Sequence, residues 1–391
     1  MEDLNRFSMK ESITIKNFGP LIDVDNINIM PFTILIGEST SGKSTLMKIL
    51  AMMRYLYKMA NIRSYLRHSK ITKSPFRMTL DTIMKRQGMG SMFSKNSLIN
   101  YRVEIENGVV YETRIENGKL YLPRINKEHL VFSKNSYISE NRNIIPTWAE
   151  KAFSNKGATL GFYFHETISD FAYASEGDKE LSLDYVGMKL RITHPKGKPT
   201  RYQIIPIDER HKPIELTESS SGVQTSVPLA LIVNYFVKEF SFKDAFNRSV
   251  MKYLYETDNL KFFQAASEPT ELPKIINIHI EEPELSLFPD AQCRMIDNLI
   301  YTATQTKDRK LSIMIATHSP YILNYLNIVL NQTKEGRAKL SNENVAAYRL
   351  YEGKLQNLLE QNEKGHWIVD SYDLSEIMGD IYNEFVELDD I

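Results

Sequence analysis

The first hundred residues change from strand-like to helix-like hydrophobic patterning. Segments 13–16, 22–29 and 32–36 are rich in β-branched residues and are separated by Gly, Asn and Pro, which predicts three short strands. From residue 43 the apolar side chains recur every three to four positions. That period predicts a helix which continues, with interruptions, to about residue 95.

Tight turns mark the next stretch of the chain. Asn107-Gly108 and Asn117-Gly118 each lie between segments of alternating polarity. Asn-Gly favours two-residue hairpin turns, because both of its residues adopt positive φ readily. We therefore predict an antiparallel meander over residues 101–122.

The second half of the chain alternates between strand and helix patterns. Apolar runs at 275–280 and 311–316 are each followed by a helix that begins at a proline, Pro289 or Pro320. This alternation predicts a parallel sheet and an α/β fold. The other expected elements are helices over 145–175, 223–242 and on to about 266, strands within 181–215, a hairpin over 345–358 and an acidic helix over 374–388.

Composition narrows the class of protein. The 391 residues are 42% hydrophobic and 25% charged, as in a soluble globular protein. The longest apolar run, 227–237, is far shorter than the roughly 20 residues that span a bilayer. We therefore expect a cytoplasmic protein with no membrane partner. A single cysteine, Cys293, excludes an intrachain disulfide and a cysteine metal cluster.

Charge is unevenly distributed, although the formal net charge is only -1. Residues 51–100 contain ten Lys or Arg and one acid, Asp81, whereas residues 369–391 contain eight acids and no base. The plain interpretation is two solvated helical faces. A basic stretch over 54–95 also suits an acidic tail of another subunit, an acidic partner protein or nucleic acid, and of these we favour protein assembly.

A glycine-bearing loop follows the strand expected at 32–36. It fits the pattern G-x-x-x-x-G-K-[ST] with the residues Gly37, Glu38, Ser39, Thr40, Ser41, Gly42, Lys43, Ser44 and Thr45. Such a loop directs backbone N–H groups and the positive end of a helix at phosphates. We expect Lys43 to reach the β- and γ-phosphates of ATP, Ser44 to bind Mg²⁺, and Glu38 to point away.

Two acids follow the buried strand expected at 275–280. Glu281 and Glu282 precede Pro283, at the tip of a strand where open α/β sheets bind ligands. Solvation of a strand end is the alternative interpretation. In the functional one, Glu281 holds Mg²⁺ through water, and Glu282 positions and deprotonates the attacking water.

Two further segments complete the set of motifs. His318 follows the second buried strand, 36 residues after Glu282, where a γ-phosphate sensor is expected. Ser221 and Gly222 open the helix expected over 223–242. Small residues at a helix N-terminus form either a simple cap or a second anion site, and their position between the other motifs favours the anion site.

These motifs, in this order, resemble the ABC-type ATPase heads of the SMC, RecF and OLD group, and in particular the OLD-like AAA-family ATPases of bacterial anti-phage defence systems. The resemblance includes residues 15–20, Walker A at 37–45, the signature at 220–224, Walker B at 278–282, the D-loop at 284–289 and His318. It implies an α/β fold: one ABC-type head over 1–391, with a parallel P-loop core, an antiparallel lobe, a basic helical insertion over 54–100 and an acidic C-terminal helix over 369–391.

The resemblance also implies how the chain works. Heads of this group pair head to tail, so Ser221 and Gly222 would contact the γ-phosphate of ATP bound by a second copy, in a homodimer or higher homo-oligomer. Departures from the pattern are Glu281, where most ABC proteins have Asp, Val223, where a second glycine is common, and a Q-loop glutamine that we do not place. About 70 residues follow His318 without a nuclease metal constellation, so a separate effector, a nuclease or toxin, is expected.

Three functions fit these features. The favoured one is an ATP-hydrolysing switch of a defence system that controls a separate effector protein. The second is a DNA repair or maintenance ATPase of the RecF or SMC type, for which long heptad arms would be expected. The third is a scaffold that binds ATP in order to assemble and hydrolyses little.

Overall fold

The protein is described here by a computed structural model. The described residues are 8–71, 79–151, 161–208, 212–256, 259–265, 271–304, 306, 308–332, 339–371, 380, 381, 383, 384 and 386. The expected acidic helix at the C-terminus therefore lies almost wholly outside the described residues, as does the stretch 72–78 of the basic segment.

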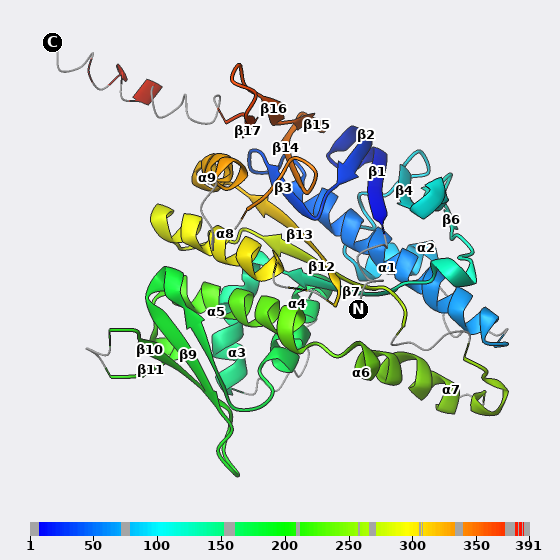
Figure 1. Ribbon diagram of the computed structural model, residues 1–391, viewed down its shortest axis with the longest axis horizontal. Coiled ribbons are helices and arrows are strands. Elements are labelled where there is room, and N and C mark those ends of the chain that lie inside the picture. The colour runs from blue at the N-terminus through cyan, green and yellow to red at the C-terminus, as the bar shows by residue number, and fades with distance from the viewer. Residues whose placement is uncertain are drawn as a thin grey trace.

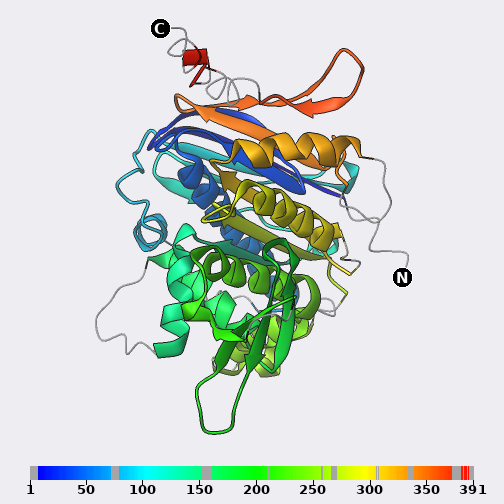
Figure 2. The same ribbon diagram turned by 90° about the vertical axis from the view of Figure 1, so that its left-hand side faces the viewer.

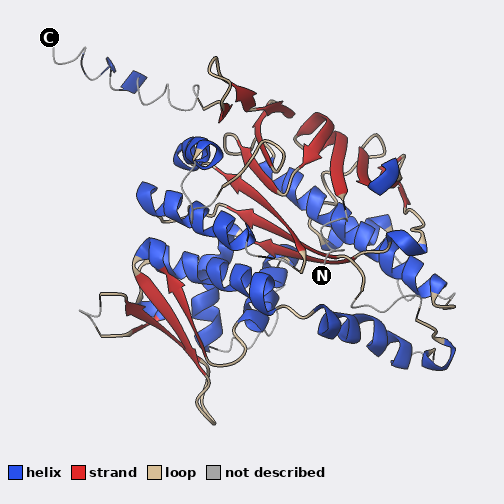
Figure 3. Ribbon diagram, viewed as in Figure 1, coloured by secondary structure: helices blue, strands red, loops and turns tan. Residues whose placement is uncertain are grey.

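Eleven strands of the described chain form one large mixed sheet, ordered β6-β5-β4-β1-β2-β15-β14-β3-β13-β12-β7 (Figures 1 and 3). Its parallel part runs through β14, β3, β13, β12 and β7. The strands are β1 (Met9–Phe18), β2 (Leu21–Ile29), β3 (Phe32–Ile36), β4 (Leu98–Ile105), β5 (Val110–Glu116), β6 (Lys119–Tyr121), β7 (Phe132–Ile138), β12 (Lys274–Glu281), β13 (Lys310–Thr317), β14 (Val345–Tyr351) and β15 (Lys354–Asn357). The fold is thus mixed α/β, with a parallel core joined to an antiparallel part.

Helices cover both faces of the parallel core. Helix α1 (Lys43–His68) lies on one face, and α8 (Pro289–Thr304) and α9 (Pro320–Asn331) lie side by side on the other (Figure 1). Helix α1 is buried on nearly every side, since α-carbon neighbours come from β5, β7, β12 and β13. It therefore shows no polar stripe of the kind that a surface helix has.

A second, smaller layer lies beyond α8 (Figure 2). It consists of a four-stranded antiparallel sheet, ordered β11-β10-β9-β8, and the helices next to it. Its elements are α3 (Ile145–Lys151), α4 (Phe162–Ala174), β8 (Lys179–Leu183), β9 (Met188–Thr193), β10 (Arg201–Pro206), β11 (Ile214–Glu215) and α5 (Ser221–Asn234). The remaining elements are α2 (Leu80–Arg86), α6 (Phe242–Phe246), α7 (Lys252–Glu256), β16 (Leu359–Gln361) and β17 (Trp367–Val369).

The strand order brings the chemical motifs to one edge. Parallel neighbours β3, β13, β12 and β7 all end at the same edge of the sheet, because they run in the same direction. The loops that follow them are 37–42, 318–319, 282–288 and 139 onward. Strand β7 was not predicted from the sequence, and it adds a fourth loop to this edge.

The basic segment differs from the prediction. Residues 54–68 are not part of an insertion, since they continue α1 through the core. Arg54 is 2% exposed and donates to the Glu11 carboxylate at 2.8 and 2.6 Å, with His279 and Ser312 also in contact. A buried arginine paired with a carboxylate is a structural feature of the core, so Arg54 cannot contribute to a surface for nucleic acid.

The hairpin turns have the backbone that Asn-Gly favours. Asn107 and Gly108 have φ of 62° and 72°, and Asn117 and Gly118 have φ of 52° and 70°. Strands β4, β5 and β6 pair antiparallel around these turns. Across the described chain, no helix combines the length and the apolar character needed to cross a lipid bilayer.

Candidate active site

The loop of residues 37–45, called the P-loop below, is closely packed between β3 and α1. Gly37 has φ of 156°, and a Cβ at this position would lie 2.5 Å from the Leu350 carbonyl oxygen. Any larger residue would therefore displace the loop from β14. Gly42, with φ of 107°, precedes the first residue of α1, so the loop opens directly onto a helix N-terminus.

The lysine of the P-loop is folded back onto the loop itself. The Lys43 ammonium donates to the carbonyl oxygens of Gly37 at 2.7 Å and Glu38 at 2.8 Å. Burial lowers the pKa of Lys43, and the carboxylates of Glu282, Glu284 and Glu38 partly oppose that change. A cation held by two neutral carbonyls can exchange them for anionic oxygens with a gain in electrostatic energy.

A cavity of about 390 Å³ lies in front of the P-loop. Its lining consists of Pro20, Ser39, Thr40, Gly42, Lys43, Ser44, Thr45, Met92, Glu281, Glu282, Ala316 and His318. The structure thus brings three of the predicted motifs, from β3, β12 and β13, onto one cavity. Among the described residues, Gly37, Glu38 and Ser41 do not line it, and the Glu38 side chain is exposed.

Glu281 is the buried carboxylate of the site. It is 2% exposed, and neither of its oxygens has a hydrogen-bond partner of good geometry among the described residues. Burial raises the pKa of Glu281 to about 7, and the neighbouring Glu140 adds to the rise. A buried carboxylate that makes no well-formed hydrogen bond fits an oxygen-seeking divalent cation such as Mg²⁺.

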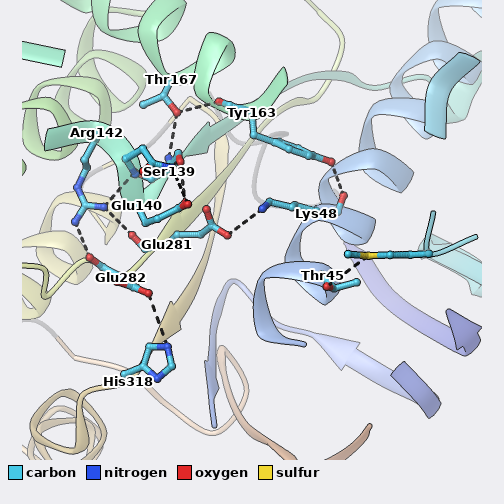
Figure 4. Close-up of polar contacts among 12 residues, drawn as sticks. Thr45, Lys48, Ser139, Glu140, Arg142, Tyr163, Thr167, Glu281, Glu282 and His318 are labelled. Carbon is cyan, nitrogen blue, oxygen red and sulfur yellow. Dashed lines mark hydrogen bonds and ion pairs between the residues drawn. The ribbon is translucent and has the colours of Figure 1, made fainter. Parts of the chain in front are cut away.

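Two residues that the sequence analysis missed flank Glu281. Lys48, one turn after Thr45 on α1, has its ammonium 3.7 Å from the Glu281 carboxylate. Glu140 follows β7 and faces Glu281 from the other side (Figure 4). Its contact with Glu281 holds the pKa of Glu140 down at about 2, so Glu140 carries the charge while Glu281 holds the proton.

Glu282 is the accessible carboxylate, and it occupies a strained backbone position. Its φ is 43°, a left-handed conformation that few residues other than glycine adopt. Its carboxylate lies 3.8 Å from the His318 imidazole, and both side chains are more than one third exposed (Figure 4). Glu284 fixes the histidine loop, because its carboxylate accepts from the Thr317 hydroxyl and the His318 backbone N–H, each at 2.8 Å.

The signature residues lie elsewhere. Ser221 is the first residue of α5, and neither it nor Gly222 belongs to the lining of the P-loop cavity. Gly222 instead packs on the loop after Glu282, where a Cβ would lie 2.7 Å from the Ser286 carbonyl oxygen. The packing of α5 therefore requires glycine at this position, whether or not Gly222 also contacts a nucleotide.

The sequence held little signal for the missed residues. Glu140 and the nearby Arg142 lie just after strand β7, whose sequence FSKNSYI contains polar residues that hide the strand pattern. Ser133 and Ser136 are nonetheless buried there. An acid and an arginine next to an unrecognised strand resemble any polar loop.

Comparison with known proteins identifies the family. The family model for the AAA ATPase domain matches residues 127–323, just over half of the chain. The chain belongs to the AAA ATPase domain family. The matched stretch of this ATPase domain includes Glu140, Ser221, Glu282 and His318, whereas the P-loop lies before it.

Known structures and curated proteins add less. The SMC head domain from Thermotoga maritima is similar over 89% of this chain and 97% of its own, at 11% identity and a TM-score of 0.36. The recombination mediator protein RecF-ATPrS of the RecFOR pathway is similar over 90% of this chain and 98% of its own, also at 11% identity and a TM-score of 0.36. No curated protein matches the chain. The assignment therefore rests on the family model.

Proposed function

We propose that this AAA-type ATPase binds Mg-ATP in the P-loop cavity and hydrolyses it with Glu282 as the general base. The observation that carries the proposal is the position of Glu282. Its carboxylate lines the same cavity as Lys43 and Ser44, and His318 stands 3.8 Å from it. A base, a cation and a hydroxyl around one cavity are what phosphoryl transfer to water needs.

The P-loop supplies the binding energy for the phosphates. Lys43 would leave the carbonyls of Gly37 and Glu38 and turn to the β- and γ-phosphates. Backbone N–H groups at the start of α1 add fixed dipoles that favour an anion. Because Lys43 is 6% exposed, its interaction with phosphate is little screened by water.

Ser44 and Glu281 are the residues that would hold Mg²⁺. Ser44 and Glu281 both line the cavity, and the Glu281 oxygens make no well-formed hydrogen bond among the described residues. When bound, the ion neutralises phosphate charge and makes the γ-phosphoryl group easier to attack. Glu281 releases its proton to bind a cation, and Lys48 at 3.7 Å favours the charged form.

Glu282 and His318 act at the γ-phosphate. The Glu282 carboxylate accepts a proton from the water that attacks the phosphorus. His318 orients the γ-phosphate, and Glu284 keeps the backbone of His318 in place. Positioning and electrostatic stabilisation account for most of the catalysis in reactions of this type.

A complete site requires a second copy. Ser221 and Gly222 are absent from the lining of the P-loop cavity in their own chain, within the residues described. We propose that they contact nucleotide held by another copy, in a head-to-tail homodimer or higher homo-oligomer. The N-terminus of α5, whose cap residue Ser220 makes no side-chain capping hydrogen bond, suits an anion from a second molecule.

The biological role that we propose is a switch of an anti-phage defence system. Its support is the resemblance of the motif set to OLD-like ATPases. Expressing the chain with its genomic neighbours and purifying it in ATP and in ADP tests this role. Nucleotide-dependent co-purification of an effector supports the switch. Tight, salt-dependent binding of DNA without an effector supports a repair ATPase instead.

Nucleotide binding tests the site directly. Lys43→Ala should weaken binding of a non-hydrolysable ATP analogue at least 100-fold in calorimetry, because the cation inside the loop is lost. Lys189→Ala, on strand β9 of the smaller sheet, is the matched control and should bind as the wild type does. Equal affinity of Lys43→Ala and wild type would exclude the P-loop as the phosphate site.

A further inference from the structure

Arg142 joins three segments of the chain through backbone carbonyls. It is fully buried and follows β7 by four residues. Its Nη1 donates to the carbonyls of Glu281 at 2.7 Å and Ser139 at 3.2 Å, and its Nη2 donates to the carbonyl of Glu282 at 2.6 Å. Its Nε donates to the carbonyl of Thr225 in α5 at 3.1 Å. Figure 4 shows the guanidinium reaching the Glu281 and Glu282 backbone.

Burying the Arg142 guanidinium costs more desolvation free energy than filling the same space with a purely structural contact would. A buried guanidinium loses its hydration, and the four hydrogen bonds that Arg142 donates to described residues go to neutral carbonyls rather than to a carboxylate. An apolar side chain would fill the space without this desolvation penalty. The planar fork, however, fixes the directions of its donors, so it holds the joined segments in one relative position.

Helix α5 also contacts the other side of the Glu282 loop. The Thr225 hydroxyl lies within hydrogen-bonding distance of the Leu285 carbonyl oxygen, at 2.9 Å, and of the Gly222 and Ser221 carbonyls of its own helix, at 3.0 and 3.1 Å. Gly222 packs so closely on Ser286 that a methyl group would not fit. The first turns of α5 are therefore tied to the chain on both sides of the general base.

Glu282 depends on these contacts for its orientation. A left-handed backbone at a residue other than glycine persists only where its surroundings fix it. Here the Glu282 N–H donates to the Ala316 carbonyl at 2.8 Å, and its own carbonyl accepts from Arg142. The backbone angles of Glu282 set the direction of its carboxylate. Movement of Arg142 would therefore redirect the base.

We propose that Arg142 is a positioning residue that transmits movement of α5 to Glu282 of the same chain. The inference rests on the proposed pairing, in which the N-terminus of α5 engages ATP held by a second copy. Binding of that ATP moves the N-terminus of α5. The Arg142 side chain moves with the Thr225 carbonyl, and the Glu282 carbonyl moves with Arg142. The base in one site is thereby aligned by the nucleotide in the other, and turnover by the pair depends on ATP cooperatively.

Arg142→Lys in the full chain tests the inference. Lysine keeps the positive charge but cannot span the four carbonyls. We expect kcat to fall at least tenfold, the affinity for a non-hydrolysable ATP analogue to change less than twofold, and the Hill coefficient for ATP to drop from above 1 to about 1. Unchanged kcat and Hill coefficient in a folded Arg142→Lys protein would overturn the inference, and so would non-cooperative turnover by the wild type.

Arg309→Lys is the matched control. Arg309 also donates to two backbone carbonyls, those of Phe236 at 3.1 Å and Phe240 at 3.0 Å, just beyond the far end of α5. Its replacement should lower the melting temperature and leave the Hill coefficient unchanged. If Arg142→Lys does not fold, Arg142→Gln replaces it as the test. The single amide nitrogen of glutamine cannot reach all four carbonyls, so this variant should lower kcat and the Hill coefficient in the same direction.

Hydrogen exchange separates this inference from the proposed function. In the wild type, the ATP analogue should slow amide exchange both at 221–226 and at 282–287. In Arg142→Lys it should slow exchange at 221–226 alone. Absence of protection at 221–226 in the wild type would contradict the pairing itself. Protection of both segments in Arg142→Lys would leave the pairing intact and refute the role of Arg142.

Discussion

Replacing Glu281 by glutamine should stabilise the nucleotide-free protein at alkaline pH. Glu281 is 2% exposed, and burial with Glu140 raises its pKa from 4.5 to about 7. Because this acid has a higher pKa when folded than when unfolded, the folded chain binds the proton more tightly. The contribution of Glu281 to the free energy of unfolding therefore falls as the pH rises from about 4.5 to about 7, and it stays low above that range. Glutamine resembles the protonated acid and removes this loss.

The magnitude follows from the pKa. A tenfold change in proton affinity corresponds to about 1.4 kcal/mol. Moving the pKa from 4.5 to about 7 thus costs the wild type about 3 kcal/mol at pH 8. With an unfolding entropy of roughly 2.1 cal/mol/K per residue, this free energy corresponds to about 4 °C for a chain of 391 residues. At pH 5 the difference should be less than about 1 kcal/mol.

Calorimetric melting in EDTA at pH 5 and pH 8 measures this effect. Glu281→Gln should melt about 4 °C above the wild type at pH 8 and nearly with it at pH 5. Glu128→Gln, at an exposed position, is the control and should show no such pH dependence. A Glu281→Gln protein that melts below the wild type at pH 8 would show that the charged carboxylate stabilises the folded protein there. Glu281 would then not be an unsatisfied carboxylate waiting for a cation.

Two further experiments test the assignment of the signature residues. Lys43→Ala and Ser221→Arg chains, each inactive alone, should recover ATPase activity when mixed, since a mixed pair holds one complete site; no recovery in a demonstrated mixed pair would refute the shared site. Gly222→Ala should cost about 1–3 kcal/mol of stability and at least tenfold in kcat, because its methyl group meets the Ser286 carbonyl at 2.7 Å. Gly161→Ala, where the new Cβ meets nothing within 4 Å, should do neither.

Prediction from the sequence succeeded where a chemical motif directly follows a continuous apolar run. The strand before the P-loop and the two buried strands that end near Glu281 and His318 have continuous apolar runs, so their tips could be placed on one edge. The parallel order of those strands then brings residues almost 280 positions apart onto one cavity. Local pattern and sheet geometry together were sufficient for this part of the site.

The rest depended on tertiary contacts that have no local signal. Arg54 counted as part of a basic surface, yet it pairs with Glu11 inside the core. Helix α1 has no polar face, because other elements of the fold surround it. The hydrophobic periodicity of the sequence does not reveal that burial. Strand β7 is rich in Ser, Lys and Asn, so Glu140 and Arg142 could not be assigned to a strand end. Their roles emerge only from their neighbours across the sheet.

The most direct measurement of the central claim is ATP turnover by Glu282→Gln. The amide cannot accept a proton from water, so kcat should fall at least 100-fold, the lower end of what general-base catalysis contributes. Affinity for ATP should remain within about twofold of the wild type, and the paired form should accumulate in ATP by light scattering. Glu128→Gln should hydrolyse ATP normally. Hydrolysis by Glu282→Gln at the wild-type rate would contradict the assignment of the general base and the mechanism built on it.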